Sequence, residues 1–277
     1  MGDAGRTRLA VLGSPISHSK SPLIHRAAYR ALGLDWAYVA ADVDGPHLAE
    51  FVERCDSSWR GLSLTMPLKR DVLPLLEHRH PLVDVVGAAN TVLFTDDGLH
   101  GFNTDVHGVA QSFRDAGVES LGYVQVLGGG ATAASVIAGV AQLGAGKVLV
   151  SARTPAKAEP LVALGESLGV AVTVRAWAIQ DRSLIAPDAI VSTVPGGQND
   201  LVFAEPIRSA SVLFDVAYDP WPSRLAQDWA DAGGSVISGL DLLVNQAVGQ
   251  VRVFVGGDPD LPLEREAEVV AAMRAAV

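Results

Sequence analysis

Cysteine is almost absent from this sequence of 277 residues, in which Cys55 is the only one. A single cysteine excludes an intrachain disulfide and any metal site built from several thiolates, and we expect Cys55 to be a thiol without a role. The histidines show neither an HExxH motif nor the close spacing of zinc ligands. We therefore expect no metal site.

Long apolar runs are also missing, since no stretch approaches the ~20 residues that a helix needs to span a bilayer. The first residues lack the long apolar segment and small-residue cleavage site of a secretory signal. These absences predict a protein without a membrane partner, located in the cytoplasm.

Basic residues are scarce relative to acidic ones: 21 Lys and Arg stand against 31 Asp and Glu, a formal net charge of −10. A nucleic-acid partner needs a basic face that this composition does not supply. We expect a small-molecule partner instead, and composition leaves open whether the protein is a monomer or a homodimer.

Hydrophobic residues make up 49% of the chain, enough for one large core or two modest ones. Strand-like runs alternate with helical periodicity almost throughout, which indicates an α/β fold with parallel sheets. In the first third, helices are predicted to start near Pro22 and Pro46, and Asp97-Gly98 favours a tight hairpin turn within residues 91–103. The strands predicted there are residues 8–13, 36–43 and 61–66.

A second unit is predicted after a helix at residues 105–116, which could bridge to it. It begins with a strand, a glycine turn and a helix within residues 123–144. From residue 240 the chain reads as helical, with Pro262 starting a final segment. The further strands predicted are residues 147–153, 171–177, 189–195, 211–218 and 234–239.

The glycine turn has the form Gly128-x-Gly130-x-x-Ala133, directly after a strand and at the start of a helix. In dinucleotide-binding proteins the first glycine permits the tight turn, the second lets the backbone approach a pyrophosphate, and the small third residue allows close helix–strand packing. Glycine-rich turns also occur for steric reasons alone, and that alternative stays open here.

The strand after this turn ends at Arg153, with Lys157 following and no carboxylate before Glu159. An NAD enzyme usually carries an acid here for the ribose hydroxyl, whereas cations suit the 2′-phosphate of NADP. The segment therefore favours NADP, unless it is only a solvated loop and helix start.

Polar residues in three further segments could take part in binding or catalysis. In GSPISHSKSP, residues 13–22, Ser21 and Pro22 form a good N-cap and N1 pair, yet a strand-to-helix junction also suits an anionic ligand. Lys69 follows a strand end, and Asp105 stands at the N-cap of the predicted bridging helix. Together they could move the proton of an alcohol, or they could be a surface lysine and a mere cap.

The sequence resembles the shikimate dehydrogenase family from its first strand almost to its C-terminus. The matching segments are GSPISHSKSP at 13–22, SLTMPLK at 63–69, GAANT at 87–91, GFNTD at 101–105, GGGATA at 128–133, ARTPAK at 152–157, VAYDPWPS at 216–223 and SGLDLLVNQA at 238–247. The resemblance implies an N-terminal α/β substrate domain, residues 1–105 completed by helices in 239–277. It also implies a Rossmann-type doubly wound NADP domain, residues 106–238.

By resemblance, the activity is the NADP-dependent interconversion of shikimate and 3-dehydroshikimate on the route to aromatic amino acids, with Lys69 and Asp105 as the catalytic pair. Which of the two accepts the proton stays open. The substrate-binding residues implied are Ser19, Ser21, Thr65, Asn90, Tyr218 and Gln246. The cofactor-binding residues implied are Gly128, Gly129, Gly130, Ala131, Thr132, Ala133, Ala152, Arg153, Thr154, Lys157, Val216 and Gly239.

The sequence also departs from the family pattern. Ser63 stands where asparagine is usual, so a polar contact near the substrate ring is expected to be shortened or lost, and Ala152 replaces another usual asparagine. Two alternatives remain: a paralogue acting on quinate or an amino analogue, and a non-catalytic NADP-binding regulator. Intact Lys69 and Asp105 favour an enzyme.

Overall fold

The computed structural model describes residues 7–177, 185–194 and 201–277, which form two compact units. Unit 1 comprises Met1–Thr104 and Gln246–Val277, and unit 2 comprises Asp105–Asn245. The boundaries predicted from the sequence fall after residues 105 and 238. The second division falls inside one continuous helix, α11 (Gly239–Gly256), where no break in the sequence pattern marks it.

Unit 1 is built on a mixed sheet with the strand order β2-β1-β3-β5-β6-β4. Strand β1 is parallel to both β2 and β3, whereas β5 is antiparallel to β3 and β6. The apolar run in β1 is buried throughout, as expected for a central strand covered on both faces. The strands are β1 (Thr7–Gly13), β2 (Trp36–Asp42), β3 (Trp59–Leu64), β4 (His78–Arg79), β5 (Thr91–Thr95) and β6 (Gly98–Phe102).

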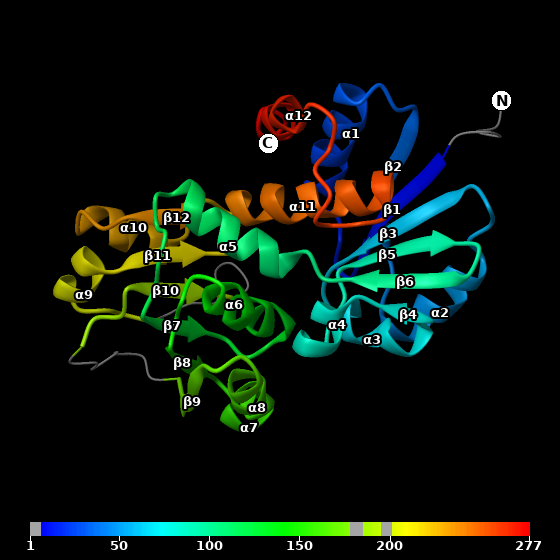
Figure 1. The fold of residues 1–277 in the computed structure, drawn as a ribbon. Helices are drawn as coiled ribbons and strands as arrows, with labels where there is room; N and C mark the ends of the chain where they lie inside the picture. Colours follow the sequence, from blue (N-terminus) through cyan, green and yellow to red (C-terminus); the bar gives the residue numbers. More distant parts are fainter. Residues whose placement is uncertain (1–6, 178–184, 195–200) are drawn as a thin grey trace. The chain divides into compact units, whose positions relative to one another are not determined.

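Helices cover both faces of this sheet (Figure 1). Helices α1, α12 and the second half of α11 lie on one face, and α2 to α4 lie on the other, over a core that includes Leu12, Leu62 and Leu68. Gly61 of β3 allows Phe254 of α11 to pack closely, since a Cβ there would lie 2.5 Å from the phenylalanine ring. The helices are α1 (Ser21–Ala31), α2 (Gly45–Glu53), α3 (Leu68–Asp71), the 3₁₀ turn η1 (Leu73–Leu75), α4 (Pro81–Val86) and α12 (Glu266–Arg274).

Two details of unit 1 differ from the sequence predictions. The β5–β6 hairpin turns at Asp96 and Asp97, one residue earlier than predicted, because Gly98 opens β6 with a φ of 122°. The last helix begins at Glu266, not at Pro262. The Glu266 carboxylate accepts hydrogen bonds from the Leu263 N–H and the Arg252 guanidinium, which holds the preceding residues in a loop.

Unit 2 is built on an all-parallel sheet with the strand order β12-β11-β10-β7-β8-β9. Counted from β7 as the first strand, this is the doubly wound order 3-2-1-4-5-6 of dinucleotide-binding domains. The strands are β7 (Tyr123–Leu127), β8 (Lys147–Ala152), β9 (Ala171–Ala176), β10 (Ala189–Ser192), β11 (Val212–Asp215) and β12 (Val236–Ser238). Pro195, at the end of one predicted strand, lies outside the described residues.

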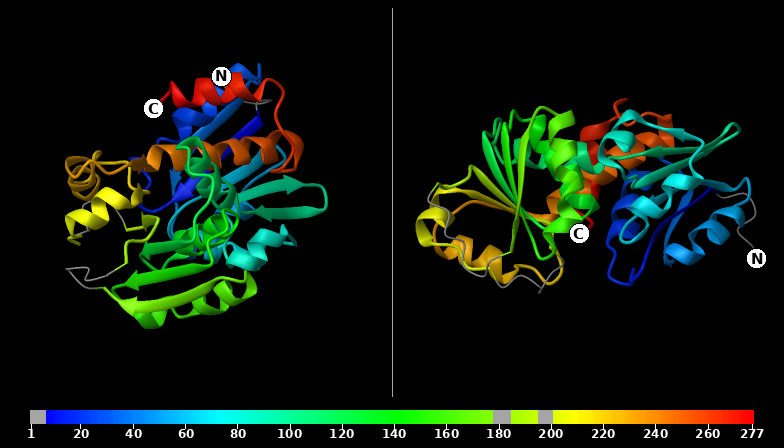
Figure 2. Two further views of the ribbon diagram at one scale, coloured as in Figure 1. Left: turned by 60° about the vertical axis from the view of Figure 1, so that its left-hand side comes forward. Right: turned by 90° about the horizontal axis from the view of Figure 1, so that it is seen from below.

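Figure 2 shows in its right-hand panel that helices lie on both sides of this sheet, α5 and α6 on one and α9 and α10 on the other. Gly139 lets α6 approach α5, since a Cβ there would lie 2.8 Å from Val109. In the part of the chain that the structure describes, no helix has both the length and the hydrophobicity to cross a membrane. The helices are α5 (Asp105–Asp115), α6 (Ala131–Ala141), α7 (Pro155–Ala158), α8 (Pro160–Ser167), α9 (Glu205–Ala210) and α10 (Arg224–Asp231).

Candidate active site

In unit 1, candidate residues gather at the edge of the sheet where β1 and β3 end. The Thr65 N–H donates to the Leu12 carbonyl across 2.9 Å, and the Ser14 N–H donates to the Met66 carbonyl across 3.0 Å. A Cβ on Gly13 would lie 2.4 Å from the Thr65 methyl group, so only glycine permits this approach. The start of the GSPISHSKSP segment and Thr65 therefore lie side by side.

The capping role considered for Ser21 is wrong. Ser21 is the first residue of α1, and the residue at the N-cap, Lys20, is helical and makes no side-chain cap hydrogen bond. The Ser21 N–H is instead 3.3 Å from the hydroxyl oxygen of Ser19, which accepts from it. Ser21 is buried and Ser19 half-buried.

Lys69 lies in the short helix α3, directly after the turn that holds Thr65. Its carbonyl accepts a hydrogen bond from the Ala89 N–H across 2.8 Å, which ties the helix to the segment leading into β5. The side chain is half-buried. The backbone thus brings Lys69 to the same edge of the sheet as Asn90.

Asn90 is the centre of a buried polar network and is 1% exposed. Its Nδ2 donates to the hydroxyl of Thr104 across 3.0 Å and lies 3.4 Å from Oε1 of Gln246, while its Oδ1 accepts from the Thr104 N–H across 2.9 Å. The structure therefore brings together Asn90 and Gln246, two residues that the family resemblance selected. Thr104 is not among the residues predicted from the sequence, although it belongs to the GFNTD segment at 101–105.

A second layer of this network involves Gln250, one turn after Gln246 on α11. Its Oε1 accepts from the Ser63 hydroxyl across 2.8 Å and lies 3.1 Å from Nε2 of His25. Ser63, which departs from the family pattern, therefore has a buried partner in Gln250, and the expected loss of a polar contact to the substrate ring stays a prediction. Burial lowers the pKa of His25 to about 3, so the imidazole is neutral. Neither Gln250 nor His25 is predicted from the sequence, because they become candidates only once α11 is known to lie on the sheet.

In unit 2, Asp105 is the first residue of α5 and is 4% exposed. A carboxylate is favoured at a helix N-terminus, where the backbone N–H groups and the helix dipole carry partial positive charge. Lys69 belongs to unit 1 and Asp105 to unit 2. Their action as a pair therefore stays a prediction.

The glycine turn lies at the switch point of the unit 2 sheet, between β7 and β10. Gly128 has a φ of 109°, and a Cβ on it would lie 2.4 Å from the Thr193 hydroxyl. A Cβ on Gly130 would meet no atom within 4 Å, which leaves open space at the N-terminus of α6. Ala133 is fully buried. This arrangement fits a pyrophosphate beside Gly130, as the motif predicts.

The cationic segment follows β8. Ala152 is buried, whereas Arg153, Thr154 and Lys157 are exposed on the loop and the first turn of α7. A further cation, Arg175 of β9, is not predicted from the sequence. It is aligned with Ser151 and donates to the Ser151 hydroxyl across 3.1 Å. Arg175 thus joins Arg153 and Lys157 as a third cation near the end of β8, and only the register of β8 and β9 reveals it.

The remaining candidates lie where β11 and β12 end. The Val216 N–H donates to the Ser192 carbonyl, and a Cβ on Gly239 would lie 2.2 Å from the Val216 carbonyl oxygen. Asp215 is 3% exposed and accepts from the Ser223 hydroxyl across 2.5 Å. Burial raises the pKa of this carboxyl. Asp215 and Ser223 thus hold together the two ends of residues 215–223, the segment that carries Tyr218.

Comparison with known proteins identifies the family of this chain. Residues 11–92 match the family described as "Shikimate dehydrogenase substrate binding domain". The chain is 30% identical, over 95% of its length and 96% of the relative, to "Shikimate dehydrogenase (NADP(+))" of Methanothermobacter thermautotrophicus. The counterpart in Methanococcoides burtonii is 34% identical over 91% of this chain and 93% of its own.

Solved structures of similar proteins extend the comparison. The crystal structure of Mycobacterium tuberculosis shikimate dehydrogenase has a TM-score of 0.84, 39% sequence identity, and coverage of 97% of this chain and 99% of its own. The enzyme of Thermus thermophilus, solved in complex with NADP(H) and shikimate, has a TM-score of 0.81 and 30% identity, covering 98% of this chain and 100% of its own. On this similarity across both units, the chain belongs to the family of NADP-dependent shikimate dehydrogenases.

Proposed function

We propose that this chain interconverts shikimate and 3-dehydroshikimate, using NADP as the carrier of hydride. The observation that carries the proposal is the similarity to NADP-dependent shikimate dehydrogenases along nearly the whole chain. We also propose that the enzyme is cytoplasmic and acts as a monomer or a homodimer.

Substrate binding is assigned to the edge of the unit 1 sheet. Ser19 and Ser21 would hold the substrate carboxylate, since hydroxyl groups near a helix N-terminus suit an anion. Thr65, Asn90 and Gln246 would bind the ring hydroxyls, and the buried hydrogen bonds of Asn90 support this assignment because they hold its amide in one orientation. Tyr218 of unit 2 would contribute one further contact.

Proton transfer is assigned to Lys69 and Asp105. When shikimate is oxidised, the hydroxyl on C3 loses its proton while the hydrogen on C3 leaves with its electron pair. The Lys69–Asp105 pair would take that proton and return it in the reverse reaction, with Asp105 orienting the lysine amine. NADP⁺, when bound, supplies the chemistry of accepting the hydride.

Cofactor binding is assigned to unit 2. Residues 128–133 would hold the pyrophosphate, and Ala152, Arg153, Thr154 and Lys157 would surround the adenosine 2′-phosphate, with Arg175 close by. Val216 and Gly239 would lie against the nicotinamide. The open space beside Gly130 and the cations after β8 fit these roles.

The test is a steady-state assay of the purified chain with shikimate or quinate and with NADP⁺ or NAD⁺, following the near-ultraviolet absorbance of the reduced nicotinamide. Turnover of shikimate with NADP⁺ well above all other combinations is the expected result. Faster turnover of quinate would make the chain the paralogue considered above. No turnover despite NADP⁺ binding would make it the non-catalytic regulator.

A further inference from the structure

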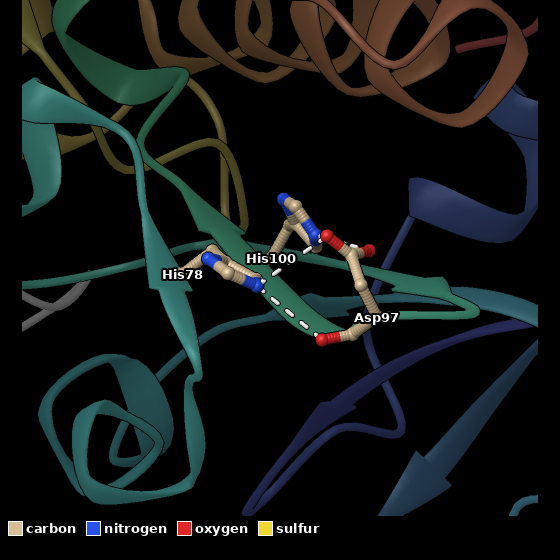
Figure 3. A group of neighbouring side chains, drawn as sticks. All are labelled: His78, Asp97 and His100. Carbon is tan, nitrogen blue, oxygen red and sulfur yellow. Dashed lines mark hydrogen bonds and ion pairs between the residues drawn. The ribbon is translucent and has the colours of Figure 1, made fainter.

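Two histidines that are distant in the sequence become neighbours in unit 1. His78 of β4 and His100 of β6 are directly aligned partners in the parallel pairing of these strands. Their rings lie 4.3 Å apart, and Asp97, in the hairpin turn before β6, reaches both of them (Figure 3). We propose that His78, Asp97 and His100 form a binding site for a divalent first-row transition-metal ion of the Zn²⁺ type.

The distances suit such an ion. His100 Nε2 lies 3.0 Å from Asp97 Oδ1, and His78 Nε2 lies 3.5 Å from Asp97 Oδ2. Two ligands about 2.05 Å from a tetrahedral Zn²⁺ are about 3.3 Å apart. One ligand atom from each of the three residues can be chosen so that all lie within 4.8 Å of one another. The side chains are 28% to 67% exposed, so an ion can reach them from solvent.

The donor set determines the class of ion. Two imidazole nitrogens and one carboxylate oxygen favour Zn²⁺, Ni²⁺, Co²⁺ or Cu²⁺ over Mg²⁺ and Ca²⁺, which prefer oxygen ligands. The Thr95 hydroxyl donates to Asp97 Oδ1 across 2.6 Å, and this hydrogen bond orients the carboxylate. The ion would replace the protons on the two Nε2 atoms, and water would complete its coordination.

Acidic residues and a cavity surround the two histidines, which favours the approach of a cation. His78 and His100 line a cavity of about 360 Å³ whose wall also includes Asp258 and Asp260. Glu77 is adjacent as well, with its carboxylate bound to the Leu99 N–H. The one cation in the wall, Arg79, donates to the Leu73 carbonyl and lies 3.5 Å from Asp84, which partly offsets its charge.

The sequence predicts no metal site, because His78 and His100 belong to different segments of the chain. The pairing of β4 with β6 is what brings them together, and β4 has only two residues and no pattern that predicts it. An ion bound here would link the edge strand β4 to the β5–β6 hairpin.

The test is isothermal titration calorimetry, in which ZnCl₂ is added to the full-length, tag-free protein after treatment with a chelator and its removal. We expect one Zn²⁺ per chain, and we expect Co²⁺ to give the visible absorption of a site with nitrogen and oxygen ligands. Because loss of even an outer partner of a metal ligand costs 10–100-fold in affinity, His78→Ala and His100→Ala should each raise the Kd by at least about 10-fold.

His47→Ala is the matched control, since His47 is an exposed histidine that contacts one carboxylate, that of Asp44, on α2. Its Kd for Zn²⁺ should equal that of the parent protein, and all three variants should keep the far-ultraviolet circular dichroism of the parent. Equal loss of affinity in His47→Ala, or Zn²⁺ binding unchanged by His78→Ala and His100→Ala, would overturn the proposal.

Discussion

The side-chain amide of Gln250 donates a hydrogen bond to the backbone carbonyl of Asn90 across 3.0 Å and so fastens helix α11 to the start of β5. The same side chain accepts from the Ser63 hydroxyl, and both Asn90 and Ser63 are buried. Gln250 thus supports the residue on which the candidate substrate site is centred.

Replacing this amide should destabilise the protein. Gln250→Leu removes the partner of the Ser63 hydroxyl and of His25 Nε2, and one partner of the Asn90 carbonyl. Each unsatisfied buried group costs ~1–3 kcal/mol. We expect a loss of at least about 2 kcal/mol in the unfolding free energy, measured by urea denaturation. Gln227→Leu, the same change at an exposed position of α10, should stay within about 0.5 kcal/mol. Similar losses in both variants would contradict a structural role for Gln250.

The buried imidazole of His25 should make stability depend on pH. Its pKa is lowered by burial from 6.5 to about 3 in the folded state. As the pH falls below 6.5, the unfolded chain gains a proton that the folded chain does not, so the unfolding free energy falls. The decrease is about 1.4 kcal/mol per pH unit until the pH nears the folded pKa.

Urea denaturation between pH 7 and pH 5 measures this effect. In His25→Phe the unfolding free energy is lower at every pH. Its decrease between pH 7 and pH 5, however, should be smaller than in the parent protein by about 2 kcal/mol. Should the variant not fold, NMR titration of the wild-type His25 imidazole provides the same information. A His25 signal that titrates near 6.5 in the folded protein would refute the prediction.

His25 and Gln250 show what could not be predicted from the sequence. Continuous apolar strands such as β1 and β7, and the glycine turn after β7, could be predicted because each carries its own local pattern. His25 and Gln250 carry no such pattern, since they become partners only when α11 packs on the sheet. The same holds for Arg175 and for the His78–His100 pair, which depend on strand register. Ser21 shows the opposite error, in which a good local capping signal is not used for capping.

Ser21 therefore offers a direct distinction between structure and binding. Ser21→Ala should raise the KM for shikimate, because each hydrogen bond to a charged group is worth ~1.5–3 kcal/mol, while the melting temperature should change little. Asp44→Ala removes an observed N-cap, that of α2, and should lower stability by ~0.5–2 kcal/mol at constant KM. A Ser21→Ala variant that behaves like Asp44→Ala would restore the capping interpretation.

Lys69 can be tested against its neighbour. Lys69→Ala should lower kcat by ~10²–10⁴-fold with only a modest change in KM, as expected for loss of a proton-transfer group. Arg70→Ala removes an exposed cation from the same short helix and should leave kcat unchanged. If both variants retain normal kcat in the steady-state assay, Lys69 has no part in proton transfer.

Arg153 should determine the choice of cofactor. The 2′-phosphate of NADP is doubly charged near neutral pH, and a guanidinium offers both positive charge and a planar pair of donors for its oxygens. We expect kcat/KM with NADP to exceed that with NAD by at least ~10-fold, which corresponds to about 1.4 kcal/mol. Arg153→Ala should remove most of this preference by raising the KM for NADP, and NAD kinetics should be almost unchanged. Arg224→Ala, at an exposed arginine of α10, is the control and should keep the parent preference. If Arg153→Ala impairs both cofactors equally, the loop after β8 supports the fold of unit 2 and does not distinguish the phosphate.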